Sequence, residues 1–242
     1  MATAKDIVIK VIPSSVANPF VRRVHYSKTV MNTSRLHFGV FYNQNLHGVM
    51  SYGCPLDRSK VLGLVVDQNG QPAPWNDMLE LNRMAFDDVL PKNSESRAIS
   101  ISIKMIRKNA PHIKWLLSFA DGTQCGDGTI YRASGFKLTG FSSGSMWLLP
   151  DYLVQLNGGL KTAHRMKIQN KSSPISKWIL GQTDGKNIQV EECVKRFGGS
   201  LLDGYMLRYI KILDDRYHLA VKEIPYSAIQ EKGAGMYKGE KR

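Results

Sequence analysis

Short apolar runs separated by turn-forming residues dominate the first part of the chain. Rich in β-branched and aromatic residues, they predict strands over residues 7–12, 36–42, 46–52 and 60–66. The polar connection Asn43-Gln44-Asn45 between the second and third runs is typical of a β-hairpin. A helix is expected over about 16–27, although Pro19 lies inside it. This order predicts a strand, a helix and then antiparallel strands.

The next part predicts a strand, a helix and a second strand. Residues 78–86 alternate as in a strand, and the polar Asp87-Asp88 and then Pro91 end the run soon. Within 94–109, isoleucines recur three and four residues apart, which places them on one helical face. The mostly apolar run 114–120 follows. An apolar strand after a helix is typical of a buried parallel pair, so a βαβ unit is expected here.

A short helix from Thr129 and two strands around 138–149 complete the first region, and Pro150 is the expected boundary. We therefore predict an α/β core over 1–149. An appended α+β region over 150–242 is expected to pack on it, with a final antiparallel pair of strands over 206–212 and 218–224.

The charge of the chain narrows the class of partner. Lys and Arg number 33 against 20 Asp and Glu, a net charge of +13, and the excess is spread along the chain. Such a basic surface favours an anionic partner, of which nucleic acid is the commonest.

No apolar run is long enough to span a membrane. The three cysteines lack CxxC spacing, which excludes a zinc ribbon and a disulfide scaffold, and a cytoplasmic location is expected.

The order of elements resembles that of the GNAT family of N-acetyltransferases. The segment Tyr131-Arg132-Ala133-Ser134-Gly135-Phe136 is similar to the signature of that fold's last helix, and 80–86 occupies the place of its fourth strand. The resemblance implies a central mixed sheet flanked by helices. The segment 92–98 departs from the family's phosphate-binding turn, because it lacks the glycines and carries Glu95. Use of acetyl-CoA rather than another small donor therefore stays open.

Several segments together resemble the phage Mom DNA-modification family. They are His25-Tyr26-Ser27, Ser94-Glu95-Ser96-Arg97, Ser118-Phe119-Ala120-Asp121, 128–133, 225–227 and 236–239. The resemblance implies an enzyme encoded by a phage or prophage and acting in the host cytoplasm. It would convert the N6 amine of adenine in double-stranded DNA to a carbamoylmethyl derivative, which protects the DNA from host restriction. The small-molecule donor and a homodimeric state are left open.

The same resemblance implies an iron-dependent site, and His25, Tyr26 and Asp121 are the ligands expected for it. Imidazole, phenolate and carboxylate together form a nitrogen and oxygen site suited to iron. From the residues alone, His25 also fits a surface histidine and Tyr26 a core tyrosine, while Asp121 could cap the turn after its strand. His37 and His47, on opposite arms of the hairpin, are an alternative pair.

Four other residues are candidates for chemistry. Ser96, with Arg97 beside it, is either an N-cap or a contact to a small anionic or acyl donor. Arg83 could bind the DNA backbone or a donor carboxylate, and Glu80 could accept a proton. A buried Glu–Arg pair is the structural alternative for both. The expected catalytic set is Asp121, Ser96, Tyr26 and Arg83.

For DNA contact, the C-terminal region offers basic residues interleaved with Trp178 and near Tyr237. They are Lys161, Arg165, Lys167, Lys171, Lys177 and Lys238. Basic residues with interspersed aromatics suit phosphate neutralisation and base stacking. The alternative is a basic face that is merely solvated.

Two rival functions remain: an acyl-CoA-dependent N-acetyltransferase acting on a small amine or protein, and a non-catalytic DNA-binding protein. A Ser-His-Asp hydrolase is disfavoured because no Gly-x-Ser-x-Gly elbow exists.

Overall fold

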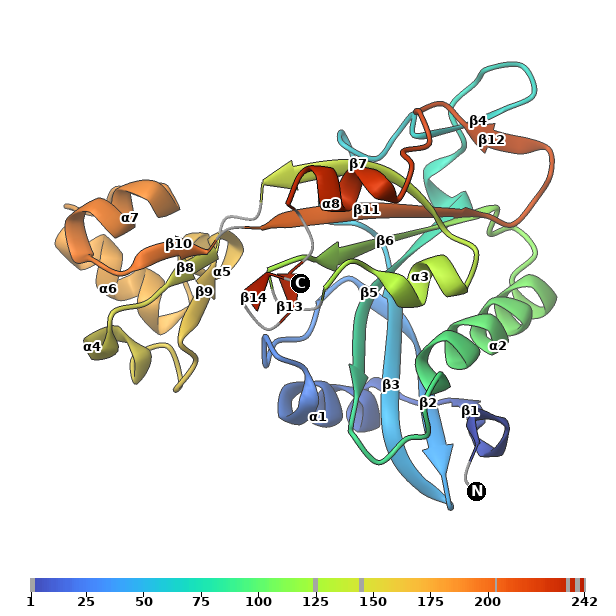
Figure 1. The fold of residues 1–242 in the computed structure, drawn as a ribbon, viewed down its shortest axis with the longest axis horizontal. Coiled ribbons are helices and arrows are strands. Elements are labelled where there is room, and N and C mark those ends of the chain that lie inside the picture. The colour runs from blue at the N-terminus through green and yellow to red at the C-terminus, as the bar shows by residue number, and fades with distance from the viewer. Residues whose placement is uncertain are drawn as a thin grey trace. The chain divides into compact units, whose positions relative to one another are not determined.

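The chain forms two compact units, each built from separate stretches of sequence (Figure 1). The structure, a computed structural model, describes residues 3–123, 126–143, 146–202, 204–233, 236–237 and 240–241. Unit 1 contains residues 1–120, 128–140 and 207–228, and unit 2 contains 121–127, 141–206 and 229–242. This division differs from the predicted single boundary near 150, because residues 207–228 return to unit 1.

A seven-stranded mixed sheet is the framework of the fold, in the order β1-β2-β3-β5-β6-β11-β7. The strands are β1 (Val8–Val11), β2 (Ser34–Tyr42), β3 (Asn45–Gly53), β5 (Met78–Phe86), β6 (Trp115–Asp121), β7 (Lys137–Ser143) and β11 (Tyr205–Ile212). The first four pair antiparallel, whereas β5 and β6 are parallel. The predicted fold class, α/β with a central mixed sheet flanked by helices, is confirmed.

The predicted hairpin is present, and its turn is short. Strand β2 ends at Tyr42 and β3 begins at Asn45, so only Asn43 and Gln44 lie between them. Both turn residues have positive φ, 46° and 67°. Two consecutive left-handed residues match the right-handed twist of the paired strands, and asparagine tolerates this conformation better than most residues.

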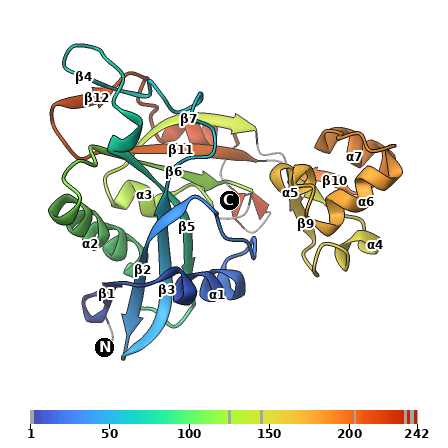
Figure 2. The same ribbon diagram turned by 180° about the vertical axis from the view of Figure 1, so that it is seen from behind.

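Helix α2 (Ser94–Asn109) connects the parallel strands β5 and β6, as the sequence predicts. Its residues Ile99, Ile103 and Ile106 are buried. Helix α1 (Ser14–Val24) instead packs through Phe20 and Val21 against apolar residues of β3 and β5. Figures 1 and 2, taken from opposite sides, show α1 and α2 on opposite faces of the sheet.

Two predicted strand features are wrong. Of the run 60–66, only its end enters a strand, β4 (Val65–Asp67). The predicted pair of 206–212 with 218–224 does not form, because β12 (Tyr217–Leu219) pairs with β4 and β11 lies between β6 and β7. In strand β11, Leu207 and Tyr209 lie on one face and Ile210 on the other, and all three are buried. A strand apolar on both faces fits the interior of a sheet better than an exposed hairpin.

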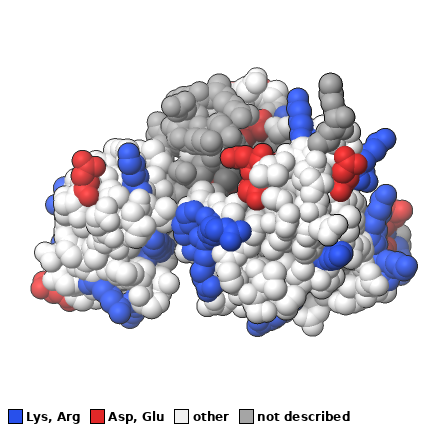
Figure 3. Space-filling view, turned by 90° about the horizontal axis from the view of Figure 1, so that it is seen from below, with Lys and Arg blue, Asp and Glu red and all other residues white. Residues whose placement is uncertain are grey.

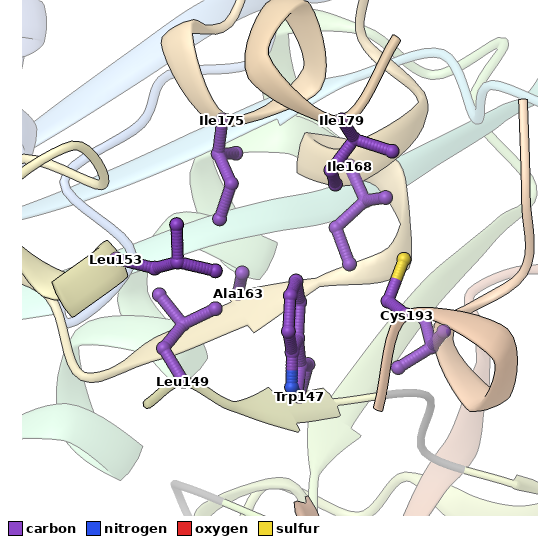
Figure 4. Packing of buried hydrophobic residues seen from close by; sticks show 9 residues of the cluster. Trp147, Leu149, Leu153, Ala163, Ile168, Ile175, Ile179 and Cys193 are labelled. Atoms are coloured by element: carbon purple, nitrogen blue, oxygen red, sulfur yellow. The ribbon is translucent and has the colours of Figure 1, made fainter. Parts of the chain in front are cut away.

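Unit 2 has a core of its own beneath a three-stranded sheet, β10-β8-β9. These strands are β8 (Met146–Leu148), β9 (Thr162–His164) and β10 (Ser200–Leu202), and the helices are α4 (Asp151–Val154), α5 (Arg165–Gln169), α6 (Pro174–Gln182) and α7 (Val190–Phe197). Figure 4 shows Trp147 among Ile168 of α5, Ile175 of α6 and Cys193 of α7. The remaining short elements are α3 (Thr129–Ala133), α8 (Ser227–Glu231), β13 (Met236–Tyr237), β14 (Glu240–Lys241) and the 3₁₀ turns Ala4–Asp6 and Trp75–Asp77.

Candidate functional site

A tight turn directly after α1 holds His25, Tyr26 and Ser27. The N–H of Lys28 donates to the carbonyl of His25 at 2.9 Å, and Lys28 itself has a φ of 53°. The amide of Ser27 donates to His25 Nδ1 at 3.2 Å, and Ser27 Oγ lies 2.8 Å from the same nitrogen. These contacts fix the orientation of the imidazole.

The two rings of this turn form a stacked pair. The centroids of His25 and Tyr26 are 4.4 Å apart, with an angle of 30° between the ring planes. Tyr26 is 38% exposed, although it is a large aromatic residue. An aromatic ring that is supported by a neighbouring ring and still open to solvent can stack with a planar ligand.

Arg83 on β5 joins this turn to the sheet. Its Nε donates to the carbonyl of Thr29 at 2.9 Å, and its Nη2 donates to Thr29 Oγ1 at 3.3 Å. Its Nη1 donates to the carbonyl of Asn82 at 2.6 Å. Because Thr29 Oγ1 also lies 2.9 Å from Ser27 Oγ, hydrogen bonds run continuously from His25 to Arg83.

A β-bulge in β5 explains why Arg83 and Glu80 meet. Leu81 pairs with Tyr52 and Arg83 pairs with Ser51, which leaves Asn82 as an extra residue. An extra residue resets the alternation of side chains, so residues three apart share a face. Glu80 and Arg83 accordingly interact electrostatically. We refer to His25, Tyr26, Ser27, Thr29, Glu80 and Arg83 as the His25–Arg83 cluster.

Burial governs the protonation of this cluster. Burial lowers the pKa of His25 to about 3, with further lowering from the charges of Arg83 and Lys28, so the imidazole is neutral. Burial raises the pKa of Glu80 to about 7, although the positive charge of Arg83 opposes the rise. A carboxyl group that titrates near neutrality can accept or donate a proton under physiological conditions.

We expect Glu80→Gln to stabilise the protein above pH 7. The unfolded carboxyl has a pKa of 4.5 and the folded one about 7. The favourable contribution of the protonated form is therefore complete below pH 4.5 and is lost as the pH rises through 7. The variant should be more stable by about 1–2 kcal/mol at pH 8.5 and unchanged at pH 4.5. Thermal unfolding at both pH values measures this.

The exposed Glu191 supplies the matched control, since it lies on the surface of α7. Glu191→Gln should follow the pH dependence of the wild type. An equal change of stability in Glu80→Gln at both pH values would contradict the shifted carboxyl.

The surroundings of His25, the first of the predicted iron ligands, do not favour a metal ion. A neutral imidazole that accepts a hydrogen bond at Nδ1 carries its proton on Nε2, so the one lone pair of His25 is engaged by the Ser27 amide, and the cation of Arg83 lies close by. Within the described ranges, no group of three or more His, Cys, Asp or Glu side chains gathers. Iron is therefore unsupported, and we derive no step through it.

Asp121, the third predicted ligand, ends β6 and belongs to unit 2. It is 6% exposed, and its Oδ1 accepts hydrogen bonds from the amide and the hydroxyl of Thr123. The carboxylate thus caps the turn that follows the strand. A catalytic role for Asp121 stays a prediction.

The alternative histidine pair has other partners. His37 is buried and its Nδ1 lies 2.8 Å from Ser51 Oγ. His47 Nδ1 lies 2.9 Å from a carboxylate oxygen of Asp87. Each histidine therefore joins neighbouring strands or a loop, and neither contact resembles a shared ligand site.

Two adjoining hollows lie around the start of α2; Ser96 lines both and Arg97 lines the larger. The larger has a volume of about 500 Å³ and is lined by Thr3, Ala4, Lys5, Pro91, Lys92, Asn93, Ser96, Arg97, Ser100 and Ala133. The smaller, of about 270 Å³, also includes Ser96. Three cations and the N-terminal end of a helix favour an anionic ligand.

The predicted N-cap role of Ser96 is wrong, because the N-cap of α2 is Asn93. The Ser96 hydroxyl instead donates to the Asn93 carbonyl.

The predicted DNA-binding residues have unequal surroundings. Lys161, Arg165, Lys171 and Lys177 are exposed. Lys167 is half-buried, its Nζ donates to the carbonyl of Asn157 at 3.1 Å, and burial lowers its pKa. Lys238 lies outside the described residues.

The aromatic residue expected among them has a structural role. Trp178 packs on the core of unit 2, 4.9 Å from the ring of Phe197 and 6.1 Å from that of Tyr152. Because edge-to-face contacts occupy its ring, it is not placed as a base-stacking platform.

The sequence missed the hydroxyls that link the cluster. The sequence indicates Ser27 only as part of a motif and predicts no role for Thr29. Their alternation after His25 is the one signal for them, since residues two apart can line the same side of an extended turn.

Comparison with known proteins identifies the family. The family model "Mom protein family" matches residues 6–228. The chain belongs to the Mom family. It is 37% identical over 138 residues to the methylcarbamoylase Mom of Escherichia phage Mu. The aligned residues cover 57% of this chain and 55% of that protein. The match thus spans about half the length of this curated relative.

Solved acetyltransferases resemble the structure more distantly. A Bacillus subtilis acetyltransferase in complex with CoA has a TM-score of 0.45 and 9% identity, covering 86% of this chain and 99% of that one. The ribosomal-protein-S5-alanine acetyltransferase of Vibrio fischeri has a TM-score of 0.46 and 12% identity, covering 87% and 94%. The resemblance to the Mom family, expected from the motifs, is confirmed.

Proposed function

We propose that the protein is a transferase that modifies DNA by placing a carbamoylmethyl group on the N6 amine of adenine, and that this protects the DNA from restriction. The His25–Arg83 cluster is the observation that carries the proposal. It combines a half-exposed aromatic stack, a carboxyl that titrates near pH 7 and a half-buried guanidinium. Membership of the Mom family supports the same reaction.

The acceptor sets two requirements that the cluster can meet. The exocyclic amine is a weak nucleophile and is paired within the duplex, so the base must leave the stack, at a cost of a few kcal/mol. The ring of Tyr26, stacked on His25, offers a surface for the extruded base. As the bond from N6 to the donor carbon forms, the donor's bond to its leaving group breaks with its electron pair, and the carboxylate of Glu80 takes the N6 proton.

Arg83 has two roles in this proposal. Its two hydrogen bonds to Thr29 hold the segment that follows the aromatic stack against β5, and a third, to the Asn82 carbonyl, fixes the guanidinium on its own strand. Its positive charge also stabilises the negative charge that develops on the departing group. Both roles require a guanidinium rather than a simple cation.

The donor site of this proposal is the pair of hollows at the start of α2. Lys5, Lys92 and Arg97 line the larger hollow, and Ser96 lines both. This chemistry suits a small anionic donor better than a diphosphate, because Glu95 lies beside the same helix end and the glycines that would let a diphosphate approach are missing.

We expect plasmid DNA from cells that express the protein to contain a modified adenosine. Mass spectrometry of the nucleosides should show a species about 57 Da heavier than deoxyadenosine, the mass of a carbamoylmethyl group replacing a hydrogen on the flipped base. DNA from cells with the empty vector is the control. Unmodified adenine in cells that contain the folded protein would contradict the proposal and favour the acyl-CoA-dependent N-acetyltransferase, which CoA binding would then test.

A further inference from the structure

A long stretch of the chain contains no acidic residue. Between Asp6 and Asp57 the sequence has neither Asp nor Glu, although it contains Lys10 and four further cations. These four are Arg22, Arg23, Lys28 and Arg35. A stretch with cations and no acids has a positive charge that no acid within the stretch cancels.

The four cations lie before, within and after the turn that carries His25, Tyr26 and Ser27. Arg22 and Arg23 are in the last turn of α1, Lys28 is in the turn, and Arg35 is near the start of β2; all are exposed. Lys28 Nζ donates to the carbonyl of Arg23. In the described part of the chain, no ion pair joins any of the four to an acid. Lys and Arg side chains are spread over the face of the molecule shown in Figure 3, which views the side of α1 from below.

A purely structural role explains only part of this arrangement. Cations in the last turn of a helix are favoured by its dipole, which accounts for Arg22 and Arg23, and Lys28 satisfies a terminal carbonyl. The helix dipole does not account for Arg35, which lies in β2, beyond the nine residues that connect α1 to that strand. It also does not explain the absence of acids from the whole stretch.

We infer that Arg22, Lys28 and Arg35 form a cationic collar that binds the phosphates of duplex DNA on either side of the extruded base. The inference rests on the proposed function, since it places DNA at the cluster that would modify it. Phosphate contacts of exposed cations position a protein on the duplex without reading its sequence. Arg23 is left out of the collar because its guanidinium lies over the ring of Phe20 at 5.0 Å.

The test replaces all three collar residues by glutamine and measures binding of a fluorescent duplex at several salt concentrations. Each lost phosphate contact should reduce the slope of log affinity against log salt by about 1, so the triple variant should lose about 3 and bind at least about tenfold more weakly at low salt. A matched control replaces Lys104, Lys108 and Lys222, which are exposed in the same unit, by glutamine. Its slope should stay near that of the wild type.

A collar variant that keeps the wild-type salt slope overturns the inference. An equal loss of slope in the matched control also overturns it, because the effect would then come from net charge and not from the collar. Changing Lys161, Lys171 and Lys177 to glutamine tests the surface expected from the sequence, and a loss confined to that variant also overturns the collar. Thermal unfolding checks that each variant is folded. Nucleoside mass spectrometry is a separate readout: DNA binding through the collar without modified adenine would contradict the proposed function and leave the collar standing.

Discussion

Arg83→Lys is expected to lower the yield of modified adenine by about 100-fold or more, since lysine keeps the charge but loses the guanidinium geometry. One ammonium cannot reproduce the hydrogen bonds from Nε, Nη1 and Nη2 to the Thr29 carbonyl, the Asn82 carbonyl and the Thr29 hydroxyl. The turn that carries Tyr26 would lose its attachment to β5. Quantitative nucleoside mass spectrometry measures the yield.

Two further variants separate the roles of Arg83. Arg196→Lys, at an exposed arginine paired with Glu192, should keep wild-type activity. Arg83→Gln removes the charge that opposes the rise in the pKa of Glu80, so the residual activity should shift to higher pH, whereas Arg83→Lys should not shift it. Wild-type yield in Arg83→Lys would show that the guanidinium neither positions the turn nor assists transfer.

Local patterns predicted most of the first unit. The hairpin, the strand 78–86, the helix 94–109 and the parallel strand after it are all present. Each depends on turn residues or periodicity within a short window, which a sequence displays directly. Strand β11 could not be placed in this way, since its position between β6 and β7 depends on strands distant in the sequence.

The candidate site was predictable as residue types and not as a network. His25, Tyr26, Glu80 and Arg83 were singled out from the sequence, and the structure brings them together through the turn after α1 and the bulge in β5. The bulge could not be foreseen, because it is defined by the pairing of Leu81 and Arg83 with the neighbouring strand. The predicted N-cap at Ser96 failed for a local reason, since the left-handed Asn93 starts the helix three residues earlier.

Unit 2 raises a functional question because Asp121, a predicted catalytic residue, is assigned to it, whereas the residues of the His25–Arg83 cluster are assigned to unit 1. Its fold depends on one small core around Trp147, whose side chain is fully buried and whose Nε1 donates to the carbonyl of Gly198 at 2.9 Å. A variant that loosens this core therefore tests whether the reaction needs an ordered unit 2.

Trp147→Ala is expected to destabilise unit 2 by about 3–5 kcal/mol, because it leaves a large cavity and a buried carbonyl without its donor. Hydrogen exchange measured on peptides from 146–202 should accelerate, while peptides from β2 and β3 keep their protection. Leu201→Ala, at a side chain that is 43% exposed, should change stability by no more than about 0.5 kcal/mol. Unchanged exchange in Trp147→Ala would contradict the separate core. If the variant loses modification and retains DNA binding, the reaction needs an ordered core in unit 2; if it keeps both, the reaction proceeds without that core.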